Sequence, residues 1–166
     1  TTYTCKTQGK NFEARMAYSI EATEFAINDH EYVDLGLPSR RKWATCNVGA
    51  SSPEEVGSFY ARGETTPKSE YTWANYKWGS AYRLTKYVTK SWYGTVDNRT
   101  VLQYQDDAAY VNWGSDWRMP TKQEQDDLSN SAYCTWTWKP NYNGSGVDGY
   151  EVKSNSNGNS IFLPAA

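Results

Sequence analysis

The sequence has only one histidine, His30, among its 166 residues. Multi-histidine zinc sites are excluded, because they need more than one imidazole. Most Ser-His-Asp and Cys-His arrangements are excluded as well, because the single histidine would have to be part of the catalytic relay. Basic charge is also in short supply: 17 Lys and Arg against 19 Asp and Glu give a net charge of −2. Such a balance disfavours nucleic acid and acidic membrane surfaces as partners. The sequence contains no run of about 18 apolar residues, so it predicts no membrane-spanning helix.

Aromatic residues replace the scarce aliphatic ones. The chain has 8 Trp, 14 Tyr and 4 Phe. Together with Ser, Asn, Gly and Thr, Tyr and Trp are typical of extracellular recognition surfaces, because they combine wide rigid contacts with adaptable hydrogen bonding. The composition therefore favours an exported binding module, extracellular or at the cell surface.

The three cysteines, Cys5, Cys46 and Cys134, allow three single bridges, and their spacing does not select one. We expect Cys46 with Cys134 if a bridge forms. The alternative is that the thiols are small buried hydrophobic groups. The absence of a C-x-x-C pair makes a zinc ribbon or a thioredoxin-type site a poor interpretation.

The length fits one domain. We assign residues 25–166 to it and residues 1–24 to an N-terminal extension or strand. Within the extension, alternating apolar positions favour a strand over 11–22. Residues 24–27 and 31–35 flank a polar turn at 28–30 and predict a β-hairpin, and 42–46 predicts a further strand.

Two segments carry helix-start signals. Ser52-Pro53-Glu54-Glu55 offers a cap, a proline in the first turn and a capping-box glutamate, and predicts a helix that ends at Gly63. Thr121-Lys122-Gln123-Glu124 repeats this pattern and predicts a second helix through Leu128. Both helices are expected to be short and capped.

The C-terminal third alternates like strands. Residues 134–138, 150–153 and 161–163 are separated by stretches rich in turn-forming residues, which predicts an antiparallel meander. With the two helices, the predicted fold class is α+β.

The segment 64–105 has little periodicity but carries nine large rings. Unstructured connections of this length are uncommon, and the aromatic density favours an ordered segment. The rings form either an unusual core or a contact platform for sugars or protein. We predict ligand contacts at Trp73, Tyr76, Trp78 and Trp92, because hydrogen-bonding residues surround these rings.

Several blocks of the sequence resemble a known family, the Fibrobacter-type major paralogous domain. The blocks are residues 27–39, 43–50, 63–68, 106–109, 113–121 and 157–166. The Trp-Arg-Met-Pro-Thr string at 117–121 is also similar to a segment of the formylglycine-generating-enzyme (sulfatase-modifying-factor) superfamily. The resemblance implies a C-type-lectin-like fold and a secreted or surface-anchored bacterial domain, generally without assigned catalysis.

The sequence departs from that family pattern in three places and at its end. Arg40-Arg41-Lys42 stands where the family usually has Gly-Thr-Leu, and Arg62 and Gln125 stand where it usually has Trp. The family also continues beyond Leu-Pro-Ala-Ala, whereas this chain ends at Ala166. We therefore expect a domain that is incomplete at its C-terminus, with open sheet edges that another chain completes.

Other charged residues have ordinary structural interpretations. Lys139-Pro140-Asn141 resembles the calcium and sugar tripeptide of C-type lectins, but a lysine repels a cation, so we expect a turn. Asp106 and Asp107 are expected to cap turns or accept from backbone amides. Arg118 is expected to lie against aromatic surface or to bond carbonyls near the second helix, and His30 to be a turn residue.

The sequence thus predicts a non-catalytic recognition or adhesion module for a glycan or protein on a surface, with no cofactor and no metal. One alternative is an assembly subunit that is completed by strand donation from another chain. A simpler explanation of the same C-terminus is a fragment or a shortened gene product. The second functional alternative is an enzyme, either carbohydrate-active or a degenerate formylglycine-generating enzyme. A hydrolase needs two carboxyl groups about 5–9.5 Å apart. The candidates are Glu64, Asp106, Asp107 and Glu124.

Overall fold

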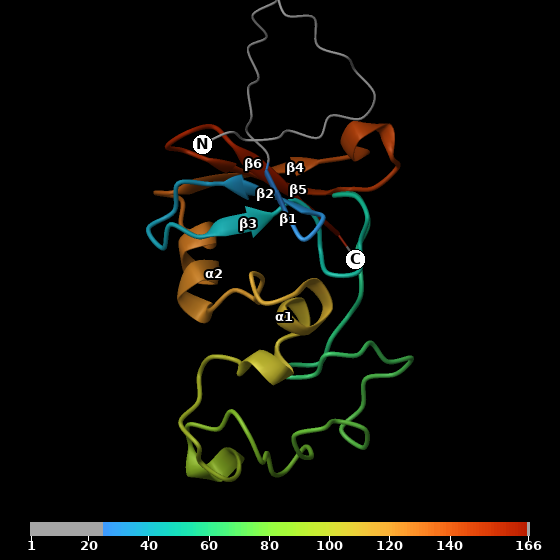
Figure 1. Cartoon of the computed structure of the whole chain (residues 1–166), viewed down its shortest axis with the longest axis vertical. Coiled ribbons are helices and arrows are strands. Elements are labelled where there is room, and N and C mark those ends of the chain that lie inside the picture. Colours follow the sequence, from blue (N-terminus) through green and yellow to red (C-terminus); the bar gives the residue numbers. More distant parts are fainter. Residues whose placement is uncertain (1–24, 166) are drawn as a thin grey trace, which may run out of the picture.

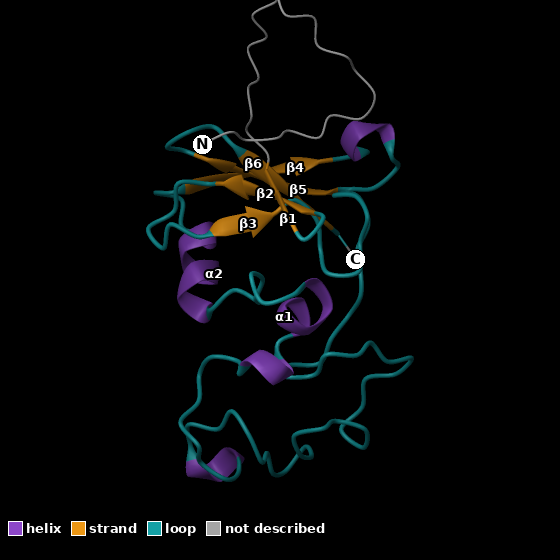
Figure 2. Ribbon diagram, viewed as in Figure 1, coloured by secondary structure: helices purple, strands orange, loops and turns teal. Residues whose placement is uncertain are grey.

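Residues 25–165 are described by the computed structural model, and they form two three-stranded antiparallel sheets with short helices (Figure 1, Figure 2). The α+β class predicted from the sequence is confirmed. The strand expected at 11–22 lies outside the described residues. In chain order the elements are β1 (Phe25–Ile27), β2 (His30–Asp34), β3 (Lys42–Ala44), the 3₁₀ turns η1 (Ser91–Tyr93) and η2 (Tyr104–Asp106), α1 (Ala108–Trp113), α2 (Lys122–Ser129), β4 (Cys134–Lys139), η3 (Tyr142–Gly144), β5 (Gly149–Ser154) and β6 (Ser160–Pro164).

The predicted hairpin of β1 and β2 is present and turns tightly. Asn28 and Asp29 have φ angles of 51° and 64°, the left-handed values that a two-residue hairpin loop needs at both positions. His30 is the first residue of β2 rather than part of the turn, and its ring stacks on Trp113 at 4.0 Å. The Asn28 amide donates to the Trp113 carbonyl at 3.1 Å, so the turn is attached to the end of α1.

The second sheet has the predicted meander, with strand order β4-β5-β6. Its apolar face and β2 enclose the main core together with α2. The buried members of that core are Val33, Leu35, Leu37, Leu128, Cys134, Val152 and Ile161. Asn157 and Asn159 both donate to the carbonyl of Asp34, at 2.9 and 2.8 Å, which connects the loop before β6 to the first sheet.

The second predicted helix is confirmed as α2. Thr121 accepts from the backbone N–H of Glu124, and the Glu124 carboxylate accepts from the backbone N–H of Thr121, so the capping box is complete. Leu128 is buried in the core, as an apolar position near the end of the helix requires.

The helix predicted from Ser52 to Gly63 is wrong, because the chain there makes only turns. The Glu55 carboxylate accepts from the Ser51 backbone N–H at 2.7 Å, and this bond provides the local cap without a helix to follow. Gly57 ends any helical path at φ 77°, and a Cβ there would lie 2.7 Å from the Val48 carbonyl oxygen. Tertiary contact with that carbonyl overrides the capping signal.

A helix that the sequence analysis did not predict, α1, starts directly after Asp107. The Asp107 carboxylate accepts from the backbone N–H of Tyr110 at 3.1 Å and from that of Met119 at 3.0 and 2.9 Å. The expected role of Asp107 as an acceptor for backbone amides is therefore confirmed. Trp113 and Trp117 are buried beside it.

Cys46 and Cys134 are free thiols, so the expected bridge between them is wrong. Cys134 is buried in the core beside Leu128, whereas Cys46 is half-buried and its Sγ lies 3.6 Å from the Ala50 carbonyl oxygen. The alternative, small buried hydrophobic groups, describes Cys134 better. Burial raises the pKa of both thiols, which reduces their nucleophilicity.

The ring-rich segment 64–105 forms the end of the molecule away from the two sheets, with α1 and α2 between them (Figure 1). Val88 is its one fully buried hydrophobic residue among those described. None of the nine rings is buried: Tyr76, Trp78 and Tyr87 are half-buried and the other six are exposed. The segment is therefore ordered without an aromatic core.

Candidate functional site

The ring-rich segment is shaped by backbone bonds around Leu84. Leu84 pairs with Gly79 in an antiparallel bridge and with Gly94 in a parallel one. A Cβ at Gly94 would lie 2.0 Å from the Leu84 carbonyl oxygen, so this approach needs a glycine. Two distant turns are thereby held against one residue, which explains the order of a segment with little regular structure.

A carboxylate holds the next part of the segment. Asp97 accepts from the backbone N–H groups of Tyr87, Val88 and Arg99, at 3.0, 2.9 and 3.2 Å. Desolvation alone would raise the pKa of Asp97, but these three bonds favour the charged form and lower it below its usual value. The chain around Tyr87 is therefore fixed from its backbone.

Gly63 permits the close approach of two rings. It has φ 76°, and a Cβ there would lie 2.8 Å from Trp78 Nε1 and 3.0 Å from the ring of Tyr87. Trp78 Nε1 donates to the Gly63 carbonyl at 2.7 Å, and the two rings meet edge to face with centroids 6.4 Å apart. The only polar atom of the Trp78 side chain is therefore hydrogen-bonded to the backbone.

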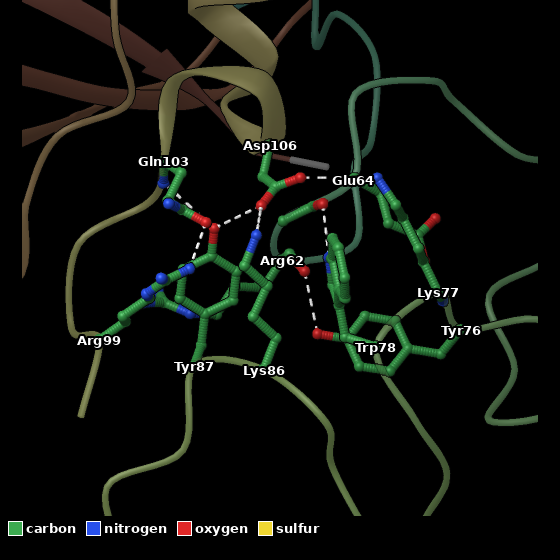
Figure 3. Close-up of polar contacts among 11 residues, drawn as sticks. Arg62, Glu64, Tyr76, Lys77, Trp78, Lys86, Tyr87, Arg99, Gln103 and Asp106 are labelled. Carbon is green, nitrogen blue, oxygen red and sulfur yellow. Dashed lines mark hydrogen bonds and ion pairs between the residues drawn. The ribbon is translucent and has the colours of Figure 1, made fainter. Parts of the chain in front are cut away.

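Asp106 is the centre of a buried charged cluster (Figure 3). Its side chain is 1% exposed and forms an ion pair with Lys86, whose own side chain is 13% exposed. The Tyr87 hydroxyl donates to Asp106 Oδ2 at 2.7 Å, and Lys77 Nζ lies 3.5 Å from Oδ1. Burial would raise the pKa of Asp106, but the bonds from Lys86 and Tyr87 lower it.

The same two lysines also contact an aromatic face. Lys77 Nζ and Lys86 Nζ lie 4.5 and 4.4 Å from the centroid of the Trp78 ring. Cation–π attraction therefore adds to the ion pairs with Asp106. Figure 3 shows Lys86 and Tyr87 below Asp106, with Trp78 and Lys77 to their right on the side of Glu64.

Glu64 is the second buried carboxylate of this region, with 5% exposure. It accepts from the backbone N–H of Lys77 at 2.8 Å and pairs with the ammonium of Lys68. Burial would raise the pKa of Glu64, but the bonds from Lys68 and Lys77 lower it. Glu64 is therefore charged at neutral pH and fully engaged in holding two lysines.

An aromatic pocket of about 360 Å³ opens beside this cluster. Its lining residues are Ala61, Arg62, Lys68, Tyr71, Thr72, Trp73, Asn75, Tyr76 and Leu84. The rings of Trp73 and Tyr76 meet edge to face at 5.8 Å between centroids. Large rings with amide, hydroxyl and cationic groups around them are the usual lining of a small-molecule or sugar site.

The pocket walls are fixed by polar bonds to backbone atoms. The Tyr76 hydroxyl donates to the Arg62 carbonyl at 2.9 Å, and the Tyr71 hydroxyl donates to the Phe59 carbonyl. Asn75 accepts from the Thr72 backbone N–H at 3.1 Å. Trp73, which is 56% exposed, contacts Tyr76 but forms no hydrogen bond within the described part of the chain.

A second pocket of similar volume, about 360 Å³, adjoins the first. It is lined by Glu64, Thr65, Thr66, Pro67, Lys68, Asn75 and Lys77. Lys68 and Asn75 line both pockets, so the two are adjacent. The second pocket has hydroxyl and charged groups where the first has rings.

Of the four predicted ligand-binding residues, the structure brings Trp73 and Tyr76 together in the aromatic pocket. Trp78 is half-buried and bonded to the Gly63 carbonyl, and it does not line the pocket. Trp92 is 71% exposed and contacts Tyr93 at 5.9 Å, and it does not line the pocket.

Sequence reasoning missed most of the polar lining. Arg62, Lys68, Tyr71 and Asn75 were not candidates. Tyr71 was counted among the nine rings, and its spacing from Trp73 was a usable signal. The others depend on the fold of the segment: Arg62, for example, precedes it in the sequence, and its carbonyl accepts from Tyr76 at the pocket wall.

The four candidate catalytic carboxylates do not meet in one cleft in the described structure. Glu64 is the only one of them that lines either pocket. Asp107 caps α1 and Asp106 pairs with Lys86. Glu124 accepts two bonds from Arg118 as well as those of the capping box.

Arg118 forms its main contact with Glu124 rather than with an aromatic surface. Its Nη1 donates to Glu124 at 2.8 Å, and also to the Met119 carbonyl at 3.0 Å, as expected for a residue near the start of the helix. The hydrogen bonds from Arg118 lower the pKa of Glu124 from 4.5 to about 2.

Lys139-Pro140-Asn141 is a turn at the end of β4, as expected, and Lys139 pairs with Glu151 at 3.2 Å. Among the described residues no group of three or more His, Cys, Asp and Glu side chains is arranged to hold a metal ion. No helix in the described range is both long and apolar enough to span a membrane.

Comparison with known proteins gave no relative: no family model, no curated protein and no solved structure matches this chain.

Proposed function

We propose that this chain is a non-catalytic recognition module that acts outside the cell or at its surface and binds a glycan or protein ligand through the rings of residues 64–105. One observation carries the proposal, the pocket formed by Tyr71, Trp73 and Tyr76. Trp73 is the ring best suited to ligand contact, because it is more than half exposed and has no hydrogen bond to lose. Its edge-to-face contact with Tyr76 keeps it in place before a ligand arrives.

We also propose that the scaffold is a C-type-lectin-like domain of the Fibrobacter-type major paralogous family. Its support is the sequence blocks that resemble the family, together with two antiparallel sheets, two short helices and one long loop segment. An experimental structure whose strand order differs from that of C-type-lectin-like domains would contradict this assignment.

The binding proposal is tested with a glycan array and the Trp73→Ala variant. We expect the unmodified chain to bind a subset of glycans and Trp73→Ala to lose that binding, since loss of a stacked ring removes about 1–3 kcal/mol. Tyr82→Ala is the matched control, because Tyr82 is 92% exposed and does not line the pocket. Equal loss in both variants would contradict a site at Trp73.

Trp92 remains a predicted ligand contact. Trp92→Ala on the same array tests whether the site extends to the neighbouring pair of Trp92 and Tyr93. We expect a partial loss for long ligands, whereas short ones reach only the pocket. Incubation of each bound oligosaccharide followed by chromatography tests the non-catalytic part of the proposal, and shortened products would contradict it.

The enzyme alternative has less support. A hydrolase of the usual type needs one protonated and one charged carboxyl group on either side of the substrate. Glu64 has a lowered pKa and is paired with Lys68, which suits neither a general acid nor a free nucleophile.

The assembly alternative is favoured by a different face. Within the described residues β4 is paired only with β5, and Trp136, Trp138 and Tyr150 are 38%, 46% and 42% exposed. An unpaired edge beside exposed rings suits another chain. Sedimentation velocity tests this proposal: a monomer over a wide concentration range contradicts self-assembly.

A further inference from the structure

The two adjacent pockets give the site two unlike halves. Trp73 and Tyr76 belong to the first half and Thr65 and Thr66 to the second, with Lys68 and Asn75 shared. A flat apolar group fits the first half, and a group that accepts hydrogen bonds fits the second. A ligand of several linked units, alternately apolar-faced and polar-edged, matches this arrangement.

Positive charge is in excess around the site. Four cations, Arg62, Lys68, Lys77 and Lys86, face two carboxylates, Glu64 and Asp106. Lys68 is paired with Glu64, and Lys86 with Asp106. Lys77 shares Asp106 with Lys86, and Arg62 has no carboxylate partner among the described residues.

Lys77 and Arg62 are the more exposed of these cations. Lys77 has a side chain that is 52% exposed, and its ammonium lies 3.5 Å from Asp106 Oδ1, whereas Lys86 pairs with the other oxygen, Oδ2. Arg62 is exposed and uses one Nη2 bond, 2.9 Å to the Thr100 carbonyl, so most of its donors are free. Lys77 lines the polar half and Arg62 the aromatic half.

The whole segment repeats this asymmetry. Residues 64–105 contain six basic and three acidic side chains, whereas the remainder of the chain contains eleven basic and sixteen acidic ones. The segment that carries the pockets therefore has a net positive charge, although the chain as a whole is acidic.

We propose that the ligand of this site is an acidic oligosaccharide, a chain of sugars that carries carboxylate or sulfate groups. One sugar ring stacks on Trp73 in the aromatic half, and the anionic group of the next unit binds the Lys77 ammonium in the polar half. Arg62 attracts the ligand from the other rim. This inference rests on the proposed function and specifies the class of ligand.

The chemistry of the site favours a sugar over other anions. The apolar faces of sugar rings stack on Trp and Tyr, and their hydroxyl groups bond Asn and Thr side chains such as Asn75, Thr65 and Thr66. A simple anion would use the lysines but leave the aromatic half empty.

Isothermal titration with hexagalacturonate tests the proposal. The comparison ligand is the same hexamer with its carboxyl groups reduced to alcohols, and a sulfated carrageenan hexamer without uronate distinguishes sulfate from carboxylate. At low salt, where charges are least screened, we expect an acidic hexamer to bind about tenfold tighter than the reduced one. The tighter of the two acidic hexamers identifies the group.

Variants then locate the charge contact. Lys77→Gln is expected to weaken acidic-hexamer binding about fivefold and to leave the reduced hexamer unchanged, with Arg62→Gln giving a smaller loss in the same sense. Lys122→Gln is the matched control, because its side chain is 85% exposed on α2, and it is expected to bind as the unmodified chain does. Melting temperatures confirm that each variant is folded.

The outcomes separate the two proposals. Equal affinity for the acidic and reduced hexamers, with loss in Trp73→Ala, overturns the acidic ligand and keeps the recognition site. Unchanged binding of a folded Lys77→Gln variant, or equal loss in Lys122→Gln, overturns the Lys77 contact. If neither acidic hexamer binds, this inference fails; the glycan array with Trp73→Ala then decides the proposed function separately.

Discussion

The Tyr87 hydroxyl donates to Asp106 at 2.7 Å and accepts from the Gln103 backbone N–H at 3.1 Å. One phenol thus connects the ring-rich segment to the residue that precedes the capping aspartate of α1. Burial raises the pKa of Tyr87, so the hydroxyl keeps its proton and continues to donate at neutral pH.

Tyr87→Phe removes that donor and leaves the Gln103 N–H without its acceptor. We expect the free energy of unfolding to fall by about 1–2 kcal/mol, because both partners are partly buried. Urea denaturation measures the change. Tyr82→Phe, at a ring that is 92% exposed, is the control and should stay within about 0.5 kcal/mol of the unmodified chain. Equal effects would show that the bond to Asp106 is unimportant.

Asp106→Asn leaves the Lys86 ammonium nearly buried without its counter-charge. Breaking one side of a buried ion pair is strongly destabilising, so we expect a loss of about 3 kcal/mol. Asp126→Asn removes the exposed pair with Lys122 and should lower stability by no more than about 0.5 kcal/mol. A small effect at both positions would contradict the importance of the Asp106 cluster.

Glu124 should make stability depend on acid. Its pKa is about 2 in the folded chain and 4.5 ordinarily, so the stabilisation is complete above the higher value and is lost as the pH falls through the lower one. Linkage gives a loss of about 2–3 kcal/mol across this window.

Denaturation at a series of pH values compares the unmodified chain with Glu124→Gln. Other carboxylates, including Asp34 and Asp106, also have lowered pKa values and contribute their own acid dependence. The difference between the two proteins isolates Glu124 and should shrink between pH ~4.5 and ~2. A constant difference would mean that the Arg118 bond does not set this pKa.

Gly63→Ala should destabilise more than a change of backbone preference alone. Gly63 and Gly144 have nearly the same φ, 76° and 75°. A Cβ at Gly63 would lie 2.8 Å from Trp78 Nε1, whereas a Cβ at Gly144 would have no neighbouring atom within 4 Å. We expect losses of about 2–3 kcal/mol at Gly63 and ~1 kcal/mol at Gly144. Thermal unfolding of both variants measures the difference, and equal shifts would contradict the steric argument.

The strands were predictable from the sequence because their signals are local. Asn28 and Asp29 mark the turn of the first hairpin, and the alternation over 134–138 marks β4. The capping box at Thr121 likewise needs only residues three apart. In each case the tertiary structure agrees with the nearest neighbours in the chain.

The predictions that were wrong concern segments whose structure is determined by contacts between residues far apart in the sequence. The Glu55 carboxylate does cap the Ser51 backbone N–H, but the Val48 carbonyl accepts from the Ser58 backbone N–H at 2.8 Å and Gly57 has a left-handed conformation, so no helix follows. Trp78 has the same kind of polar neighbours in the sequence as Trp73. Because Gly63 has no Cβ, however, the Trp78 ring packs against it, whereas Trp73 remains exposed. The pocket needs Arg62 and Asn75 together, and their sequence separation gives no sign of that.

The ring-rich segment is held by hydrogen-bonded carboxylates and by backbone bonds around Leu84, with few apolar contacts. Its fixed points, Glu64, Asp97 and Asp106, are different residues from the rings that face solvent. Substitutions of exposed rings such as Trp73 and Trp92 should therefore change the solvent-facing surface of the segment while the same anchors preserve folding. This division of labour makes the segment a natural place for diversification by mutation and a practical one for engineered libraries.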